Sequence, residues 1–309
     1  MKAQNADKNV FGIVGNTPLV EITKLSGCAS FGSRIFAKLE FLNPSGSIKD
    51  RMAKFMLEDA EERGLLKNKK IVEATSGNTG ISFAMLCAAR GYEFTAVMPQ
   101  TASMERRALM RQYGAKIVLT ETFGCEQAVK VAREIAARES AWLPDQYANE
   151  ANAHAHEKTT GMEILAQAAR VDAFVAGIGT GGTLIGVGRA VRAKFPDALV
   201  AGVEPEESPT INSGKHGVHG IQGISIGFIP ELYERNKRLV NEVVRVNTRE
   251  AIECAKQLSL REGLRAGISS GANVCAALRV AKKIEKSGGT VVTILPDASD
   301  RYYSTPLFE

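Results

Sequence analysis

The sequence has no long apolar run. No stretch approaches the roughly 18 uninterrupted apolar residues of a membrane span, and residues 1–9 are polar, without the apolar h-region of a signal peptide. We therefore expect a protein that neither spans a membrane nor is secreted by that route. The five cysteines are widely spaced, with no Cys-x-x-Cys pair and no Cys/His cluster at zinc spacing. That pattern is typical of reduced thiols in a cytoplasmic protein, and it predicts no metal site.

Charge of one sign is not concentrated anywhere. Lys and Arg number 39 against 34 Asp and Glu, and the net charge of +5 is spread along the chain without a basic block or interleaved aromatic residues. This pattern argues against nucleic-acid binding, whereas a mild positive excess suits small anionic ligands. Internal repeats and low-complexity tracts are missing too. The length of 309 residues, with 44% hydrophobic and 24% charged content, is enough for about two globular domains.

Short β-branched or apolar runs alternate with longer helical patterns from about residue 34 onward. This alternation is the signature of βα units and predicts an α/β fold with parallel sheets. The predicted strands are 34–40, 70–74, 93–98, 116–120, 172–177, 199–204, 241–246 and 290–295, and the predicted helices lie near 49–63, 80–90, 102–113, 124–139, 153–169, 182–194, 248–262 and 271–287.

Two segments interrupt this alternation. Residues 142–152 have little periodicity and fall between two blocks of βα units, so we interpret them as a crossing between domains. Residues 205–236 are rich in Gly, Pro, Ser and His and predict a long irregular loop. Long loops in compact enzymes more often have a functional role than none.

A glycine-rich run, residues 177–183, directly follows one predicted strand and precedes a helix. Glycines there let the backbone approach an anion, and the free N–H groups at the start of the helix can bind phosphate. Thr180 and Thr183 can add hydroxyl donors. The run is not a Walker loop and lacks the third glycine of a dinucleotide fingerprint. The alternative is a tight turn that serves packing alone.

Residues 75–80, Thr-Ser-Gly-Asn-Thr-Gly, lie likewise between a predicted strand and a predicted helix. Their side chains and N–H groups form a cup of neutral donors that suits a carboxylate or a phenolate oxygen. The alternative is a plain capping sequence, since Ser, Thr and Asn are preferred at helix N-caps.

Lys49 follows a turn-rich stretch and begins a strongly helical one. Alone it could be an exposed lysine in the first turn of a helix. With the glycine-rich run and the cup, however, it completes what pyridoxal phosphate requires: a Schiff-base lysine, a phosphate cradle and a site for the substrate carboxylate, with Asn78 beside the ring hydroxyl. Ser269, before the helix predicted at 271, offers a hydroxyl for the pyridine nitrogen.

At this point the sequence resembles a known family, the O-acetylserine sulfhydrylases (cysteine synthases) and cystathionine β-synthases of the fold-type II pyridoxal-phosphate enzymes. The resemblance runs from about residue 15 to residue 305. The segments that match in the family's order are SIKDR (47–51), TSGNTG (75–80), MPQTASMERR (98–107), HEKTTGMEI (156–164), GTGGT (179–183), VEPEESP (203–209), GIQGI (220–224) and AGISSGA (266–272).

The resemblance implies an α/β fold like that of the tryptophan synthase β subunit, with two open, twisted, mostly parallel sheets flanked by helices. It implies a large domain of residues 1–46 and 153–309 and a smaller mobile domain of residues 47–152 that closes over substrate. Homodimers are usual in this family, and a complex with serine acetyltransferase is possible.

The resemblance also implies roles for particular residues. Lys49 would hold the cofactor and then take the α-proton, helped by an amine pKa that burial and a nearby cation depress. Asn78 would bind the ring hydroxyl and Ser269 the ring nitrogen. The phosphate would be bound by Gly179, Thr180, Gly181, Gly182 and Thr183, and the amino-acid substrate by Thr75, Ser76, Gly77, Thr79, Gln146 and, near the entrance, Gly223.

The implied reaction is a β-replacement: O-acetyl-L-serine and sulfide give L-cysteine and acetate through an α-aminoacrylate. Alternatives within the same chemistry are cystathionine or lanthionine formation, or sulfide release from cysteine. A further alternative is a catalytically silent relative that binds a partner, against which the intact Lys49 argues. Ser225 and Ile226 replace smaller residues often seen in the family, which leaves the choice of substrate open.

Other polar residues invite functional interpretations that we weigh against simpler ones. His154 and His156 lack a third metal ligand, and His216 and His219 are as readily solvated loop residues. Asp50 and Arg51 are expected to cap and orient the helix that begins beside them. Asp297 and Asp300 could be mistaken for an acid pair, and Cys125 and Cys275 are interpreted as small core residues.

Overall fold

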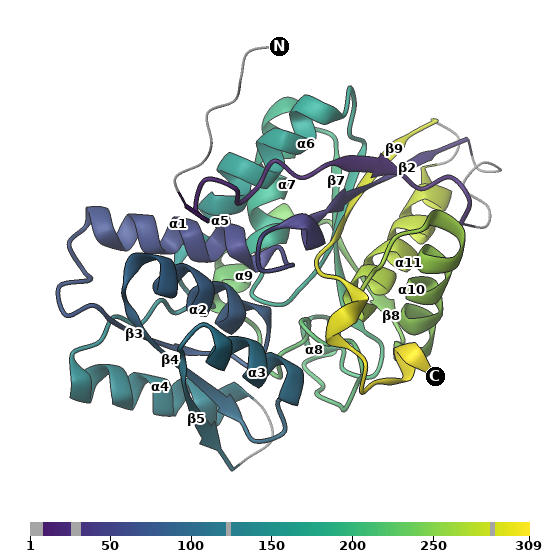
Figure 1. Cartoon of the computed structure of the whole chain (residues 1–309). Helices are drawn as coiled ribbons and strands as arrows, with labels where there is room; N and C mark the ends of the chain where they lie inside the picture. Colours follow the sequence, from purple (N-terminus) through teal and green to yellow (C-terminus); the bar gives the residue numbers. More distant parts are fainter. Residues whose placement is uncertain (1–8, 26–31, 122–124, 285–287) are drawn as a thin grey trace.

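The computed structural model describes residues 9–25, 32–121, 125–284 and 288–309 and contains two separate β-sheets (Figure 1). The larger, six-stranded sheet has the order β1-β2-β9-β6-β7-β8, and the smaller has the order β3-β4-β5. The pairing of β1 with β2 is antiparallel, whereas the other pairings between described strands are parallel. The strands are β1 (Leu19–Glu21), β2 (Arg34–Leu39), β3 (Lys70–Ala74), β4 (Glu93–Pro99), β5 (Lys116–Thr120), β6 (Ala173–Gly177), β7 (Leu199–Pro205), β8 (Glu242–Val246) and β9 (Thr290–Leu295).

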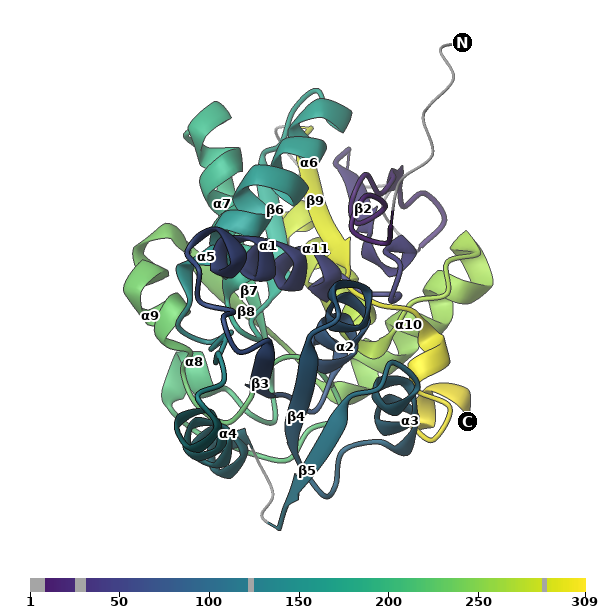
Figure 2. The ribbon, with the colours of Figure 1, turned by 60° about the vertical axis from the view of Figure 1, so that its left-hand side comes forward.

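Helices cover both sheets, which confirms the predicted α/β fold class (Figures 1 and 2). Among the described residues, each helix is too short or too polar to span a bilayer. The helices are α1 (Lys49–Glu62), α2 (Asn78–Arg90), α3 (Met104–Gln112), α4 (Cys125–Glu139), α5 (Glu150–Ala155), α6 (Met162–Gln167), α7 (Gly182–Lys194), α8 (Thr210–Ser213), α9 (Glu231–Asn236), α10 (Thr248–Glu262) and α11 (Ile268–Lys283), with a π-helical turn η3 (His156–Gly161) between α5 and α6 and short 3-10 turns η2 (Glu40–Leu42), η4 (Lys237–Leu239), η6 (Ser299–Arg301) and η7 (Pro306–Phe308).

The central strands read as continuous apolar runs because both faces of the larger sheet are covered. In β9, Val291 and Val292 point to opposite faces, and both are fully buried. Val291 belongs to a hydrophobic cluster with residues of α10 and α11 on one face of the sheet. Val292 belongs to a second cluster with residues of α6 and α7 on the other face. The smaller sheet is covered in the same way, by α1, α2 and α3 on one face and α4 on the other.

Several predicted boundaries differ from the structure. The single helix predicted at 153–169 is divided into α5, the π-helical turn and α6. The loop predicted at 205–236 contains the short helices α8 and α9. The helix predicted from residue 271 begins at Ile268, and the one predicted from residue 80 begins at Asn78, so Ser269 and Asn78 lie in first turns rather than before them. Residues 124 and 285–287 of the predicted helices lie outside the described residues.

The polar segments follow the carboxyl ends of strands from both sheets. Residues 75–77 connect β3 to α2, and residues 178–181 connect β6 to α7. Ligands in open parallel sheets bind beyond the carboxyl ends of the strands, which here face one another. The division of the chain at residues 46/47 and 152/153, and the mobility of the smaller part, remain predictions.

Candidate active site

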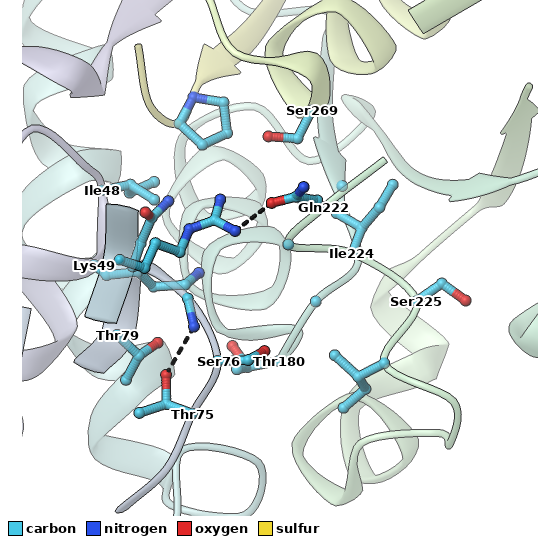
Figure 3. A pocket seen from close by; sticks show the side chains of 18 of the residues that line it. Ile48, Lys49, Thr75, Ser76, Thr79, Thr180, Gln222, Ile224, Ser225 and Ser269 are labelled. Atoms are coloured by element: carbon cyan, nitrogen blue, oxygen red, sulfur yellow. Dashed lines mark hydrogen bonds between the residues drawn. The ribbon is translucent and has the colours of Figure 1, made fainter. Parts of the chain in front are cut away.

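A cavity of about 580 Å³ lies between the two sheets and brings the predicted site residues together. It is lined by Lys49, Thr75, Ser76, Gly77, Asn78, Thr79, Gln146, Gly179, Thr180, Gly181, Thr183, Gly223 and Ser269 (Figure 3). Gly182 is not in the lining. Its N–H donates to Thr180 Oγ1 over 3.3 Å, so it supports the turn from behind.

Lys49 is the first residue of α1 and is half-buried in the cavity wall. Desolvation lowers the pKa of its amine to about 8, and the negative charge of Asp297 opposes that shift. The expected contribution of a nearby cation is therefore wrong: burial acts alone, against an anion. This lowered pKa makes the unprotonated amine, the form that a nucleophile or a base needs, more accessible near neutral pH than in an ordinary lysine.

Of the capping and orienting role expected for Asp50 and Arg51, the capping part is wrong, because no side chain caps α1, and buried contacts provide the orientation. Asp50 accepts hydrogen bonds from the backbone N–H of Ser45, over 2.7 Å, and from Ser82 Oγ, over 2.5 Å. Arg51 pairs with Glu40 at 2.6 Å and with Glu163 at 2.6 Å. These bonds fix the turn before α1 and the start of the helix, and so they hold Lys49 in the cavity wall.

The cup at residues 75–79 is organised by hydrogen bonds with two different purposes. Thr75 Oγ1 accepts from the N–H of Gly80 at 3.1 Å and so satisfies a backbone group in the first turn of α2. This contact agrees with the alternative interpretation of residues 75–80 as a helix-capping sequence. Thr79 Oγ1 donates to Gln146 Oε1 at 2.7 Å, which brings the predicted crossing segment to the cup. Gly77 is the N-cap residue and has no side chain to satisfy the first N–H groups of α2. These N–H groups and the positive end of the helix dipole remain suited to a carboxylate.

The glycine-rich turn before α7 leaves no room for side chains on its inner face. A Cβ on Gly179 would lie 2.3 Å from the carbonyl oxygen of Gly223, and Gly181 has a φ of +88°. Close packing therefore explains why residue 179 is a glycine, in agreement with the alternative interpretation of this run as a tight turn. The turn nevertheless lines the cavity, where Thr180 is 6% exposed and is fixed by Asn152 Nδ2 at 3.0 Å. Backbone N–H groups at the start of a helix, with hydroxyls beside them, are a phosphate-binding arrangement.

Some groups of the residues that line the cavity have no hydrogen-bond partner among the described residues. Neither the Lys49 amine nor the Ser269 hydroxyl forms a hydrogen bond to a described side chain or backbone group, and Figure 3 shows Ser269 directed toward the cavity. Asn78 is fixed instead, because its Nδ2 donates to Asp297 Oδ2 at 2.7 Å. The residues present thus fit pyridoxal phosphate: an open amine, an open hydroxyl and a glycine turn shaped for an anion.

Two neighbours of the site were assigned other roles from the sequence. His156, considered only as a metal ligand, is buried, and its Nε2 lies 3.3 Å from Thr183 Oγ1. Burial lowers its pKa well below the ordinary value, with smaller effects from the Lys49 and Arg51 charges. Asp297 accepts from Asn78 and from Tyr302 Oη. In the sequence, only the segment HEKTTGMEI, which matches the family and begins at His156, indicated that this residue could lie near the site.

The remaining candidates lie apart from the chemistry or at its edge. His219 lines the cavity and its Nε2 bonds the Ser225 carbonyl oxygen at 3.1 Å, whereas His216 is exposed and bonded to Thr210. Within the described ranges, no three His, Cys, Asp or Glu side chains gather as a metal site requires. Cys275 is half-buried and burial raises its thiol pKa, while the side chain of Cys125 lies outside the described part.

Comparison with known proteins gives a consistent result. Residues 10–297 match the model of a family described as "Pyridoxal-phosphate dependent enzyme". A cysteine synthase of Staphylococcus aureus (strain Mu50 / ATCC 700699) is 43% identical over 99% of this chain and 98% of its own. Cysteine synthase from Entamoeba histolytica superposes with a TM-score of 0.92 at 35% identity, covering 100% of this chain and 92% of its own. A hydrogen sulfide-producing enzyme (Fn1055) from Fusobacterium nucleatum superposes with a TM-score of 0.90 at 39% identity, covering 96% and 90%.

Proposed function

The chain belongs to the fold-type II family of pyridoxal-phosphate dependent enzymes that includes the cysteine synthases, and from this premise we propose that it converts O-acetyl-L-serine and sulfide into L-cysteine and acetate. The observation that supports this most directly is the single cavity into which Lys49, the cup at 75–79 and the turn at 179–183 all face. A cysteine synthase needs those three elements within the length of one cofactor and one amino acid.

In this proposal the chain's own residues bind, orient and move a proton. The N–H groups and hydroxyls of residues 179–183 hold the cofactor phosphate, and Asn78 and Ser269 hold its ring hydroxyl and ring nitrogen. Residues 75–77 and 79, with Gln146, hold the carboxylate of the amino acid. Pyridoxal phosphate, when bound, supplies the electron sink that eases loss of the α-proton and of the β-substituent.

Lys49 holds the cofactor and takes the α-proton, for which its lowered pKa of about 8 suits it. Ser269 offers a hydroxyl rather than a carboxylate to the ring nitrogen, so it does not force a proton onto that atom. A ring left neutral is a moderate electron sink, which favours rapid β-elimination over racemisation or transamination.

The test is a product assay on the purified protein loaded with pyridoxal phosphate. O-acetylserine alone should change the visible absorption of the cofactor and release acetate, and sulfide should reverse that change while cysteine appears. Absence of acetate release from O-acetylserine would contradict the proposal.

A second candidate is sulfide release from cysteine, or formation of a thioether amino acid such as cystathionine or lanthionine. It is supported by the likeness to the hydrogen sulfide-producing enzyme and by Ser225 and Ile226, which line the cavity where the sequence resemblance leads us to expect smaller residues. Steady-state rates with cysteine alone against O-acetylserine plus sulfide separate the two: a much faster sulfide release from cysteine favours the second.

Assembly and movement belong to the same proposal. We propose a homodimer, an association with serine acetyltransferase, and closure of residues 47–152 over the substrate, with Gly223 moving at the entrance. Gly223 has a φ of +94° and open space where a Cβ would stand, which supports a hinge-like position. Light scattering, with and without the acetyltransferase, tests the first two.

A further inference from the structure

A buried arginine in the cavity wall has no ion-pair partner among the described residues. Arg106, the third residue of α3, is 7% exposed and lines the cavity, yet it forms no ion pair with a described carboxylate. Its Nη1 donates to Gln222 Oε1, the bond marked beside Gln222 in Figure 3, and its Nε has no hydrogen-bond partner. Its guanidinium carbon lies 5.4 Å from the centre of the Tyr302 ring. A buried guanidinium held only by an amide oxygen and a ring face is incompletely compensated.

The closest acidic groups are already engaged. The Asp297 Oδ2 atom accepts from Tyr302 Oη at 2.8 Å and from Asn78 Nδ2 at 2.7 Å. Glu105, the preceding residue, has a lowered pKa, first because its carboxylate accepts from its own backbone N–H; bonds from Ser304 and Ser103 lower it further, and the charge of Arg106 contributes least. Arg106 thus has only a weak electrostatic interaction with Glu105 and no ion pair with a described carboxylate, so its guanidinium is open to an anion from outside the chain.

The next residue has similar bonding but a different place. Arg107 is 9% exposed, forms no ion pair with a described residue and has an Nε without a hydrogen-bond partner, but its Nη2 donates to the Gln100 carbonyl oxygen and it does not line the cavity. Arg107 connects α3 to the residue after β4, whereas Arg106 lines the cavity.

The other walls of the cavity already have their anions under the proposed function: the cofactor phosphate at 179–183 and the amino-acid carboxylate at 75–79. Arg106 comes from a third segment of the lining, α3, and bonds Gln222 of the loop at 205–236. We infer that Arg106 and Gln222 form a further anion subsite, which takes the carboxylate or sulfonate end of an incoming thiol and so selects anionic nucleophiles.

This inference rests on the proposed function and names its second substrate class. In the reaction, the thiol sulfur forms the new bond to Cβ of the amino acid, the bond from Cβ to the acetate oxygen breaks, and the thiol proton leaves with the acetate. No oxidant or reductant is needed. A charge-assisted hydrogen bond to a guanidinium changes binding by about 10- to 100-fold.

The first test compares 2-mercaptoethanesulfonate with uncharged 2-mercaptoethanol as nucleophiles for the holoenzyme and O-acetylserine. The ratio of their kcat/KM values should fall about 10- to 100-fold in Arg106→Met. It should stay unchanged in Arg107→Met, the matched loss of a buried arginine on the same helix. If the ratio of the two kcat/KM values is unchanged in a folded Arg106→Met protein, the inference is wrong.

The second test needs no turnover. Calorimetry should show that ethanesulfonate, an unreactive anion, binds the wild-type holoenzyme and binds Arg106→Met at least about tenfold more weakly. Gln222→Glu keeps the arginine and sets a carboxylate beside it, so it should also abolish ethanesulfonate binding. Retained binding in Gln222→Glu would overturn the inference even if Arg106→Met failed to fold.

The two proposals fail in different ways. If the wild-type enzyme makes cysteine but both tests show no effect of Arg106, the subsite is wrong and the function stands. If acetate is never released from O-acetylserine, the function is wrong, and calorimetry alone decides whether Arg106 binds anions.

Discussion

Asn78 Nδ2 lies 2.7 Å from Asp297 Oδ2, and this hydrogen bond joins the first turn of α2, beside the smaller sheet, to the segment that follows β9 of the larger sheet. Asp297 also accepts from Tyr302 Oη at 2.8 Å. The amide that we assign to the ring hydroxyl is thus fixed from the opposite side of the cavity, so its position depends on how both sheets are placed.

Replacing Lys49 by Ala should remove the proton transfer. We expect kcat/KM for O-acetylserine to fall by about a thousandfold or more, because positioned acid–base groups contribute about 10²- to 10⁴-fold. Cofactor absorption and acetate release are the measurements. Lys67→Ala, at an exposed lysine beyond the end of α1, is the control and should leave both unchanged. A Lys49→Ala protein with near-normal activity would assign the proton to another group.

The pH dependence should follow the same amine. Burial lowers the pKa of Lys49 to about 8, so the unprotonated, basic form increases as pH rises through that value. The rate of α-proton removal should therefore rise with pH and be half-maximal near about 8. Stopped-flow absorption with O-acetylserine across a pH series measures it. A rate that falls over the same range would mean that the protonated amine is the active form.

His156 should act on cofactor affinity through Thr183. Replacement of His156 by Leu removes the partner of the Thr183 hydroxyl, a hydrogen bond worth about 1 kcal/mol, and should weaken binding of pyridoxal phosphate about fivefold. Equilibrium dialysis of the cofactor measures this directly. His154→Leu, at an exposed position two residues earlier, serves as the control. Equal affinity in the two variants would leave His156 with a packing role only.

Arg51 should matter for stability. Its guanidinium pairs with Glu40 at 2.6 Å and with Glu163 at 2.6 Å, and the side chains of Arg51 and Glu40 are almost fully buried. Arg51→Met leaves the buried carboxylate of Glu40 without a cation, while Glu163 keeps its pair with Lys38 at 2.8 Å, and it should lower the free energy of unfolding by about 3–5 kcal/mol. Denaturant unfolding of the holoenzyme measures the loss.

The control for that change is an exposed pair. Arg63 bonds Asp59 at 3.0 Å on the surface of α1, and Arg63→Met should cost no more than about 0.5 kcal/mol. If both variants lost the same stability, the buried network would be no stronger than a surface pair.

Much of the fold could be predicted because its signals are local. The run TVVTIL consists of β-branched and apolar residues, as is typical of a strand buried on both faces, and it forms β9 at the predicted residues. β1 was missed because its three residues are too short to show a period. The division of the helix predicted at 153–169 was missed because it depends on contacts with a distant helix. A Cβ on Gly161 would lie 2.6 Å from that of Ala190, so the π-helical turn packs directly against α7.

The candidate site divides in the same way. The sequence by itself determined the identity of Lys49, the donors at 75–79 and the glycines at 179–183, because each belongs to a short segment between a strand and a helix. Only the tertiary structure decided that Asp297 opposes the pKa shift of Lys49, that His156 supports Thr183, and that Arg106 lies in the cavity without an anion. Those properties depend on contacts between residues far apart in the chain. Burial and charge there depend on which elements pack together, and a local sequence pattern does not contain that information.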